Sequence, residues 1–155
     1  MSGAGIIIGA DHAGFHLKAA LKSHLTGLGL AVTDVGTPGS DPVDYPLFGA
    51  EAAARVSSGE FSRGVLICGS GIGMAVVANK FPDVRAAVCL DEDTARLGRR
   101  HNDINVLCLA GRKTDPARAV KIIDVWLETA FEGGRHLRRI ERIRDIEAQR
   151  CRSQR

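Results

Sequence analysis

Short apolar runs alternate with longer amphipathic segments along the whole chain. The runs that are short enough for buried strands span residues 5–9, 30–35, 65–68, 85–90 and 104–110. The longer segments have the spacing or the end signals of helices, and they span residues 13–28, 47–58, 72–80, 92–100, 116–131 and 135–150. Gly133 and Gly134 separate the last two helices.

This alternation predicts an α/β fold, a three-layer α/β/α sandwich around a five-stranded parallel sheet. Strands that alternate with helices pair in parallel, and their right-handed crossovers put helices on both faces of the sheet. The result is a Rossmann-like single domain over residues 1–155. Ligands of such sheets bind beyond the carboxyl ends of the strands. The residues that follow the expected strand ends include Asp11, His12, Cys68, Asp91, Gly111 and Arg112.

The last expected helix has too few apolar residues to be buried in its own domain. Its apolar positions repeat at a spacing of three and form a narrow stripe of Leu137, Ile140, Ile143 and Ile146. We therefore expect this C-terminal helix to reach a partner subunit. Residues from about 148 to 155, which end an arginine-rich stretch, are expected to form a disordered tail.

Composition narrows the class of protein. The chain has 45% hydrophobic and 25% charged residues, which is typical of a soluble globular protein. A net charge of +3 does not indicate a nucleic-acid partner, and no apolar run reaches the ~20 residues of a membrane helix. Without a secretion signal or a CxxC pair, the prediction is a cytoplasmic protein with reduced thiols and no metal. Cys89 and Cys108 are expected in the core and Cys151 on the surface.

The segment after the third apolar run is the strongest candidate for chemistry. Cys68 ends the expected strand, and Gly69 to Gly73 form a loop with little side chain before a helix. Backbone N–H groups at a helix N-terminus bind anions and favour the thiolate form of a nearby cysteine. No Gly-Lys-Ser/Thr follows, so this is not a Walker loop. A tight turn is the structural alternative, and Asp91, about 20 residues on, leaves a nucleotide site open.

Two pairs of polar residues have both a chemical and a structural interpretation. Asp11 and His12 follow the first strand, where they could transfer protons or bind a hydroxyl and a phosphate. Asp11 could equally be a helix cap. His101 closes a helix, a position that favours a protonated histidine, but Asn102 could simply cap that helix in a left-handed conformation.

Arginines near the C-terminus suggest an anion site. Arg135 and Arg139 are four residues apart and share one helix face, and together with Arg112 they could clamp a dianion. The alternative is a solvated, charged helix face. We assign the other histidines, His16, His24 and His136, to the surface.

Five segments resemble the ribose-5-phosphate isomerase B family, which also includes the galactose-6-phosphate isomerase subunits. They are GADHAGFHLK near the start, DYP at residues 44–46, ICGSGIGMAVVANK in the middle, RxHNDxNVL at residues 99–107, and EGGRHLRRIE at residues 132–141. They occur in the family's order and cover the chain from the first strand to about Glu147.

The resemblance implies a metal-free, cofactor-free aldose–ketose isomerase that acts on sugar phosphates. Cys68 would be the base that removes the C2 proton, as in the cysteine subtype of the family; the other subtype uses a glutamate a few residues later. His101 would open the sugar ring and Asp11 would handle the anomeric hydroxyl. Ser70, where the family usually has threonine, would contact O1 and O2.

The remaining site residues also follow from the resemblance. Asn102 and the loop of Gly69, Gly71, Ile72 and Gly73 would hold the enediolate, Tyr45 would contact the substrate, and the phosphate would be bound by His12, Arg112, Arg135 and Arg139. Family members build each site from two chains, which implies a homodimer with shared active sites, or a tetramer of such dimers.

Ribose 5-phosphate is the expected substrate. Allose 6-phosphate, galactose 6-phosphate and a tetrose 4-phosphate are alternatives with the same chemistry. A non-catalytic module that binds phosphate or nucleotide is the alternative from another class.

Overall fold

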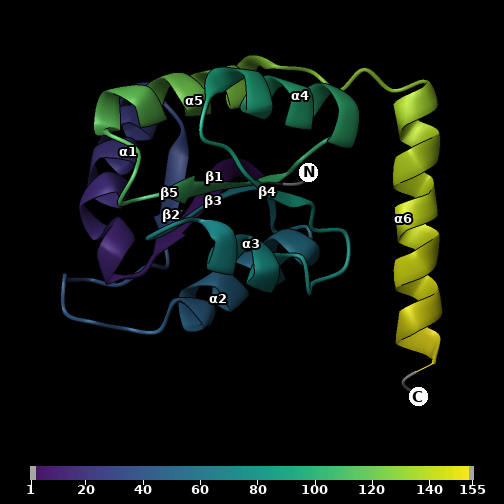
Figure 1. The fold of residues 1–155 in the computed structure, drawn as a ribbon, viewed down its shortest axis with the longest axis horizontal. Helices are drawn as coiled ribbons and strands as arrows, with labels where there is room; N and C mark the ends of the chain where they lie inside the picture. The colour runs from purple at the N-terminus through teal and green to yellow at the C-terminus, as the bar shows by residue number, and fades with distance from the viewer. Residues whose placement is uncertain (1–2, 154–155) are drawn as a thin grey trace.

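A computed structural model, which describes residues 3–153, has the predicted three-layer architecture (Figure 1). Every strand pairing in its sheet is parallel, and the strand order is β2-β1-β3-β5-β4. The strands are β1 (Gly3–Ala10), β2 (Ala31–Asp34), β3 (Phe61–Cys68), β4 (Ala86–Val88) and β5 (Val106–Ala110). The predicted fold class is therefore confirmed, and the strand that ends in Cys68 lies at the centre of the sheet.

Two hydrophobic clusters join the helices to the two faces of the sheet. The helices are η1 (His12–Gly14), α1 (Phe15–Gly27), α2 (Tyr45–Ser57), α3 (Ile72–Ala78), α4 (Glu92–Asn102), α5 (Pro116–Glu128) and α6 (Arg135–Arg152). One face packs against α1, α4 and α5, and the other against α2 and α3 (Figure 1). Trp126 of α5 is fully buried in the first cluster. No described helix has the length and apolar character to span a bilayer.

Side chains of β3 alternate between the two clusters. Val65 and Ile67 pack with α1 and α5, whereas Leu66 and Cys68 point toward α2 and α3. This burial on both faces is typical of a central parallel strand, and it turns the thiol of Cys68 toward the side of the sheet where α3 begins.

Some strand boundaries differ from the prediction for identifiable reasons. The strand β3 begins at Phe61 rather than at residue 65, because Arg63 can remain in a largely buried strand. Its Nη1 donates to the carbonyls of Trp126 and Leu127, each at 3.1 Å, and its guanidinium lies over the Trp126 ring. The left-handed residue after α4 is Asp103, with φ 47°, and not Asn102, which is still helical.

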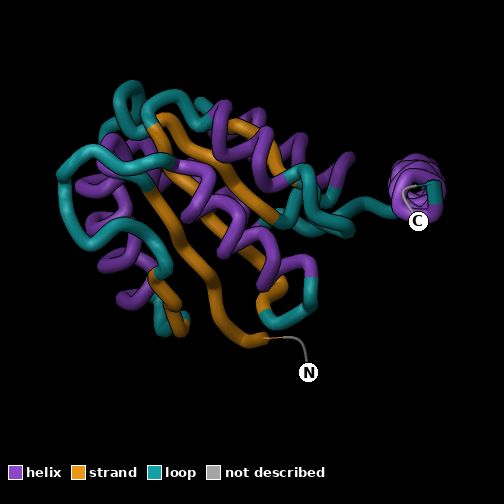
Figure 2. Tube along the Cα trace, turned by 90° about the horizontal axis from the view of Figure 1, so that it is seen from below, coloured by secondary structure: helices purple, strands orange, loops and turns teal. Residues whose placement is uncertain are grey.

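The helix α6 stands beside the α/β body rather than on it (Figures 1 and 2). Ile140 is buried, but Leu137, Ile143 and Ile146 are exposed. Near its far end, Arg144 pairs with Asp83. The structure differs from the expected disordered tail at 148–155, since α6 continues to Arg152; residues 154 and 155 lie outside the described residues.

Candidate active site

A cavity of about 650 Å³ opens at the carboxyl ends of the central strands. The residues around it are Asp11, Tyr45, Cys68, Gly69, Ser70, Ile72, Gly73, Val76, Arg112 and Lys113. Eight of these ten are residues that the sequence analysis selected, and the chain brings them together from β1, α2, β3 and β5. Val76 and Lys113 were missed, although Lys113 directly follows Arg112 beyond a strand end.

Hydrogen bonds from the chain after β5 fix the loop that follows Cys68. Gly111 N donates to Cys68 O at 2.8 Å, and Arg112 N donates to Gly69 O at 3.2 Å. The Arg112 guanidinium reaches over Gly69, where a Cβ would lie 3.1 Å from Nη1. The thiol itself is almost buried, with the residue 4% exposed, and it borders the cavity. The Cys68 side chain and the Arg112 guanidinium thus border the same cavity.

The glycines of this loop are required by close contacts. Gly71 has φ 77°, and a Cβ there would lie 3.1 Å from the Leu109 backbone. At Gly73 a Cβ would lie 2.5 Å from Cζ of Tyr45, so the Tyr45 ring packs directly on the loop. Ser70 Oγ accepts a hydrogen bond from Ile72 N at 3.2 Å. The loop therefore presents backbone and one hydroxyl to the cavity, which suits an oxyanion.

Asp11 serves as a cap and also borders the cavity. Its carboxylate accepts from Ala13 N at 3.0 Å and from Gly14 N at 3.2 Å, so the predicted capping role is confirmed. Its own N–H donates to Ile67 O, next to Cys68. These bonds hold a buried carboxylate at the wall of the cavity.

His12 is held by the loop before α2. Val43 N donates to His12 Nδ1 at 3.1 Å, which leaves the proton of a neutral imidazole on Nε2. Lys18 anchors the start of that loop through Asp34 at 2.9 Å and Thr37 O at 2.8 Å. Burial alone would raise the pKa of Asp34, but the hydrogen bonds from Lys18 and Gly36 outweigh it and hold that pKa below its ordinary value.

Four other predicted site residues lie near the amino ends of the strands, at the end of the sheet opposite Cys68. They are His101, Asn102, Arg135 and Arg139. α4 runs antiparallel to the strands, so its last turn reaches their amino ends. Asn105, just after that turn, accepts from Gly64 N of β3 at 2.9 Å. Gly64 precedes Cys68 by four residues, or about 13 Å of strand. One chain therefore contains two separate halves of the predicted site.

His101 belongs to a compact cluster with Glu132 and His136. The two imidazole rings stack with centroids 4.3 Å apart and planes at 10°. Glu132 Oε2 is 3.9 Å from His101 Nε2 and 3.5 Å from His136 Nε2, and Arg100 pairs with Oε1. His136 is buried, not on the surface as expected. Its burial, with His101 and Arg135 nearby, lowers its pKa, whereas Arg100 lowers the pKa of Glu132.

This cluster is also the candidate metal site among the described residues. Ligand atoms of His101, Glu132 and His136 lie within 4.8 Å of one another, and such a set suits Zn²⁺. However, Arg100 already neutralises Glu132, and Arg135 and Arg139 add positive charge beside His136. These surroundings favour an anion over a divalent cation.

Comparisons with known proteins agree with this fold and identify its family. The family model for Ribose/Galactose Isomerase matches residues 6–143. Over 145 residues the chain is 44% identical to ribose-5-phosphate isomerase B of Escherichia coli K12, covering 94% of this chain and 97% of that protein. An α/β isomerase is thus the class that the fold and the cysteine loop define. The chain belongs to the Ribose/Galactose Isomerase family.

Solved structures lead to the same family. Ribose-5-phosphate isomerase B of Clostridium thermocellum superposes with a TM-score of 0.91 at 46% identity, covering 93% of this chain and 97% of that one. The enzyme of Mycoplasma genitalium, solved with bound ribulose-5-phosphate, has a TM-score of 0.89 at 40% identity, with coverage of 93% and 96%. The resemblance drawn from the five sequence segments is confirmed.

Proposed function

We propose that this chain is an isomerase that interconverts D-ribose 5-phosphate and D-ribulose 5-phosphate. The observation that carries the proposal is one cavity bordered by the Cys68 thiol, the Asp11 carboxylate and the 69–73 loop. Relatives also support the proposal, since proteins named ribose-5-phosphate isomerase B match nearly the whole chain. Because sugar phosphates are charged and stay inside cells, we also propose a cytoplasmic location.

In this mechanism Cys68 acts on the open-chain sugar. The thiolate removes the proton from C2 of the aldose, and the electron pair moves onto the carbonyl oxygen at C1 to form a cis-enediolate. The proton of the C2 hydroxyl then passes to O1, and the same thiol returns its proton to C1 as the C2 carbonyl forms, which gives the ketose. Loop amides between Gly69 and Gly73, with the Ser70 hydroxyl, stabilise the oxyanion; such preorganised donors are each worth about 3–4 kcal/mol.

Ring opening is a separate step. Ribose 5-phosphate is mostly a furanose, so His101 protonates the ring oxygen while Asp11 takes the proton from the anomeric hydroxyl, and the bond between C1 and the ring oxygen breaks. Ribulose 5-phosphate needs no such step, because its phosphate ester occupies the oxygen that would close a furanose ring. We assign the phosphate to His12, Arg112, Arg135 and Arg139, whose binding energy fixes the orientation of the sugar.

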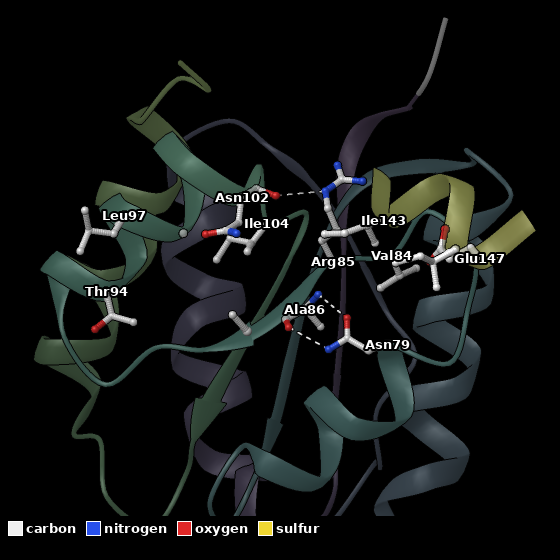
Figure 3. A pocket seen from close by; sticks show the side chains of 13 residues that line it. Asn79, Val84, Arg85, Ala86, Thr94, Leu97, Asn102, Ile104, Ile143 and Glu147 are labelled. Atoms are coloured by element: carbon white, nitrogen blue, oxygen red, sulfur yellow. Dashed lines mark hydrogen bonds between the residues drawn. The ribbon is translucent and has the colours of Figure 1, made fainter. Parts of the chain in front are cut away.

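We further propose that two chains share each site, because within one chain Cys68 lies at the carboxyl ends of the strands and His101 lies near their amino ends. A second, mostly apolar cavity of about 670 Å³ lies between α6 and the body, lined by Asn102, Ile143 and Ile146 among others (Figure 3). Beside the Cys68 cavity, Ile72 and Val76 are more than half exposed. Apolar surfaces at both halves of the site fit a homodimer that joins them.

Subunit complementation tests the shared site. Cys68→Ala and His101→Asn should each be inactive alone. In a mixed dimer, one site would combine two intact halves, so unfolding and refolding an equal mixture should restore about a quarter of the wild-type activity. A matched control mixes Cys68→Ala with Ser70→Ala, which damage the same half and should not complement. Full inactivity of the first mixture would contradict shared sites.

The substrate is tested directly with the purified wild-type protein. We expect turnover of ribose 5-phosphate in a coupled assay, unchanged by EDTA. Turnover only of allose 6-phosphate, galactose 6-phosphate or erythrose 4-phosphate would keep the mechanism but change the substrate. Inactivity toward all four, without solvent deuterium entering C2, would instead favour the phosphate-binding module.

A further inference from the structure

Glu132 is an acidic residue of the His101 cluster to which the proposed mechanism gives no role. It lies between α5 and α6, and its carboxylate meets Arg100, His101 and His136. We propose that Glu132 is a positioning residue that holds the His101 imidazole and its proton ready for ring opening, with His136 as the neutral partner. This inference rests on the proposed role of His101.

Glu132 is fixed to α4 at two points. Its N–H donates to Arg100 O at 3.1 Å, and its Oε1 pairs with the Arg100 guanidinium. Arg100 directly precedes His101, so these contacts keep the Glu132 carboxylate near the histidine even though α6 stands away from the body. Oε2 then points at both imidazoles, 3.9 Å from Nε2 of His101 and 3.5 Å from Nε2 of His136.

The stacked histidines disfavour a state in which both rings are protonated. Two imidazolium rings with centroids 4.3 Å apart repel each other, so the second protonation of the pair is disfavoured. His136 is 5% exposed and is flanked by Arg135 and Arg139, and this burial and charge lower its pKa. Among the described residues that face the pair, Arg100, Arg135 and Arg139 are cationic and Glu132 is the anionic group. These contacts therefore disfavour a proton on His136, the more buried ring of the pair.

The same contacts set the surroundings of His101. The carboxylate lies 3.9 Å from Nε2 of His101, beyond hydrogen-bond distance, so it acts on the ring through its charge. A carboxylate near an imidazole stabilises the imidazolium form, as in other carboxylate–histidine pairs, while stacking on His136 holds the plane of the ring. Glu132 itself transfers no proton, so its loss should weaken the acid without affecting the thiol base.

The test separates ring opening from proton abstraction. In Glu132→Gln, turnover of ribose 5-phosphate should fall by about 10- to 100-fold, since the acid is less often protonated. Exchange of the C1 proton of ribulose 5-phosphate with D₂O, which needs Cys68 but no ring opening, should stay within about two-fold. The alkaline limb of kcat should also move to lower pH by about one unit, because the imidazolium has lost its counter-charge.

Glu141→Gln, at an exposed glutamate of α6, is the matched control and should change neither assay. Glu132→Asp keeps the charge but draws the carboxylate back from both imidazoles, so it should give the same pattern more weakly, which keeps a test available if Glu132→Gln unfolds. Equal loss of turnover and exchange, or an unmoved alkaline limb, would overturn the proposal.

An NMR titration of His101 separates this inference from the proposed substrate. Its midpoint should fall in Glu132→Gln whichever sugar the protein uses, whereas inactivity of the wild type toward ribose 5-phosphate would count only against the substrate. An unchanged midpoint would overturn the positioning role.

Discussion

The His101 and His136 rings lie face to face, and both Nε2 atoms lie within 4 Å of the same Glu132 oxygen. This arrangement joins a partly exposed histidine to a buried one. Burial, together with the nearby His101, Arg135 and Arg139, lowers the pKa of His136 and so favours its neutral form in the folded chain. The cluster therefore links the pH of the solution to the stability of the protein.

Acid should destabilise the fold partly through His136. Its folded-state pKa lies below the ordinary value of 6.5, so below that pH the unfolded chain binds more protons than the folded chain. The contribution of His136 to stability is full above pH 6.5 and is lost as the pH falls through the lower, folded-state pKa. We expect the drop in Tm between pH 7.5 and pH 5.5 to be smaller in His136→Asn than in the wild type. His16→Asn, at an exposed histidine, should retain the full drop; equal drops in all three proteins would exclude this role.

Removing the thiol should abolish turnover but not binding. Cys68→Ala deletes the proposed base while Arg112 and the 69–73 loop remain, so kcat should fall by about 10³-fold or more. Calorimetry should show ribulose 5-phosphate binding within about three-fold of the wild type. Substantial residual activity would mean that another group removes the proton.

Thiol reagents should distinguish the four cysteines. Cys89 and Cys108 are fully buried, and burial raises the pKa of both thiols, that of Cys89 to about 12. Iodoacetamide at pH 8 should therefore label exposed Cys151 and, at the cavity, Cys68. In Cys151→Ser, inactivation should follow labelling of one site and should be slowed by ribulose 5-phosphate, as measured by peptide mass spectrometry. Labelling of Cys89 in the folded protein would contradict the packing described here.

The backbone of Val43 should influence phosphate binding through His12. Val43→Pro removes the N–H that donates to His12 Nδ1 and so frees the ring to change tautomer. The lost hydrogen bond should raise KM by about 5- to 10-fold with little change in kcat, because the phosphate lies far from the reacting carbons. Val43→Ala keeps the N–H and should behave like the wild type. A ¹⁵N spectrum of His12 reports the tautomer directly, and an identical spectrum in Val43→Pro would contradict the assignment.

The half of the site around Cys68 could be predicted from the sequence, because its residues either adjoin Cys68 in the chain or follow the end of a strand. Cys68 and the glycine loop are adjacent in the chain, and Asp11 and Arg112 each follow a strand end, which a parallel sheet brings to one edge. The choice between cap and functional residue at Asp11 could not be made that way, because the same carboxylate caps η1 and borders the cavity.

Long-range contacts account for what the sequence did not reveal. His136 lies in a strongly polar helix, and it is buried where its ring stacks on His101, 35 residues earlier in the numbering. Arg63 resembled a residue outside a strand because its partners, the carbonyls of Trp126 and Leu127, lie more than 60 residues away. The separation of Cys68 from His101 was likewise invisible in a linear motif.

The loop between Gly69 and Gly73 also constrains how this protein can diversify. It presents main-chain amides, held by Gly111 and Arg112 of the neighbouring segment and by the packing of Tyr45 on Gly73. Amides persist when side chains are replaced, so the oxyanion pocket is inherited almost intact through sequence drift. New sugar preferences must then arise at the rim, at residues such as Val76 and Lys113. Directed evolution toward another aldose should begin at those positions and leave the glycines untouched.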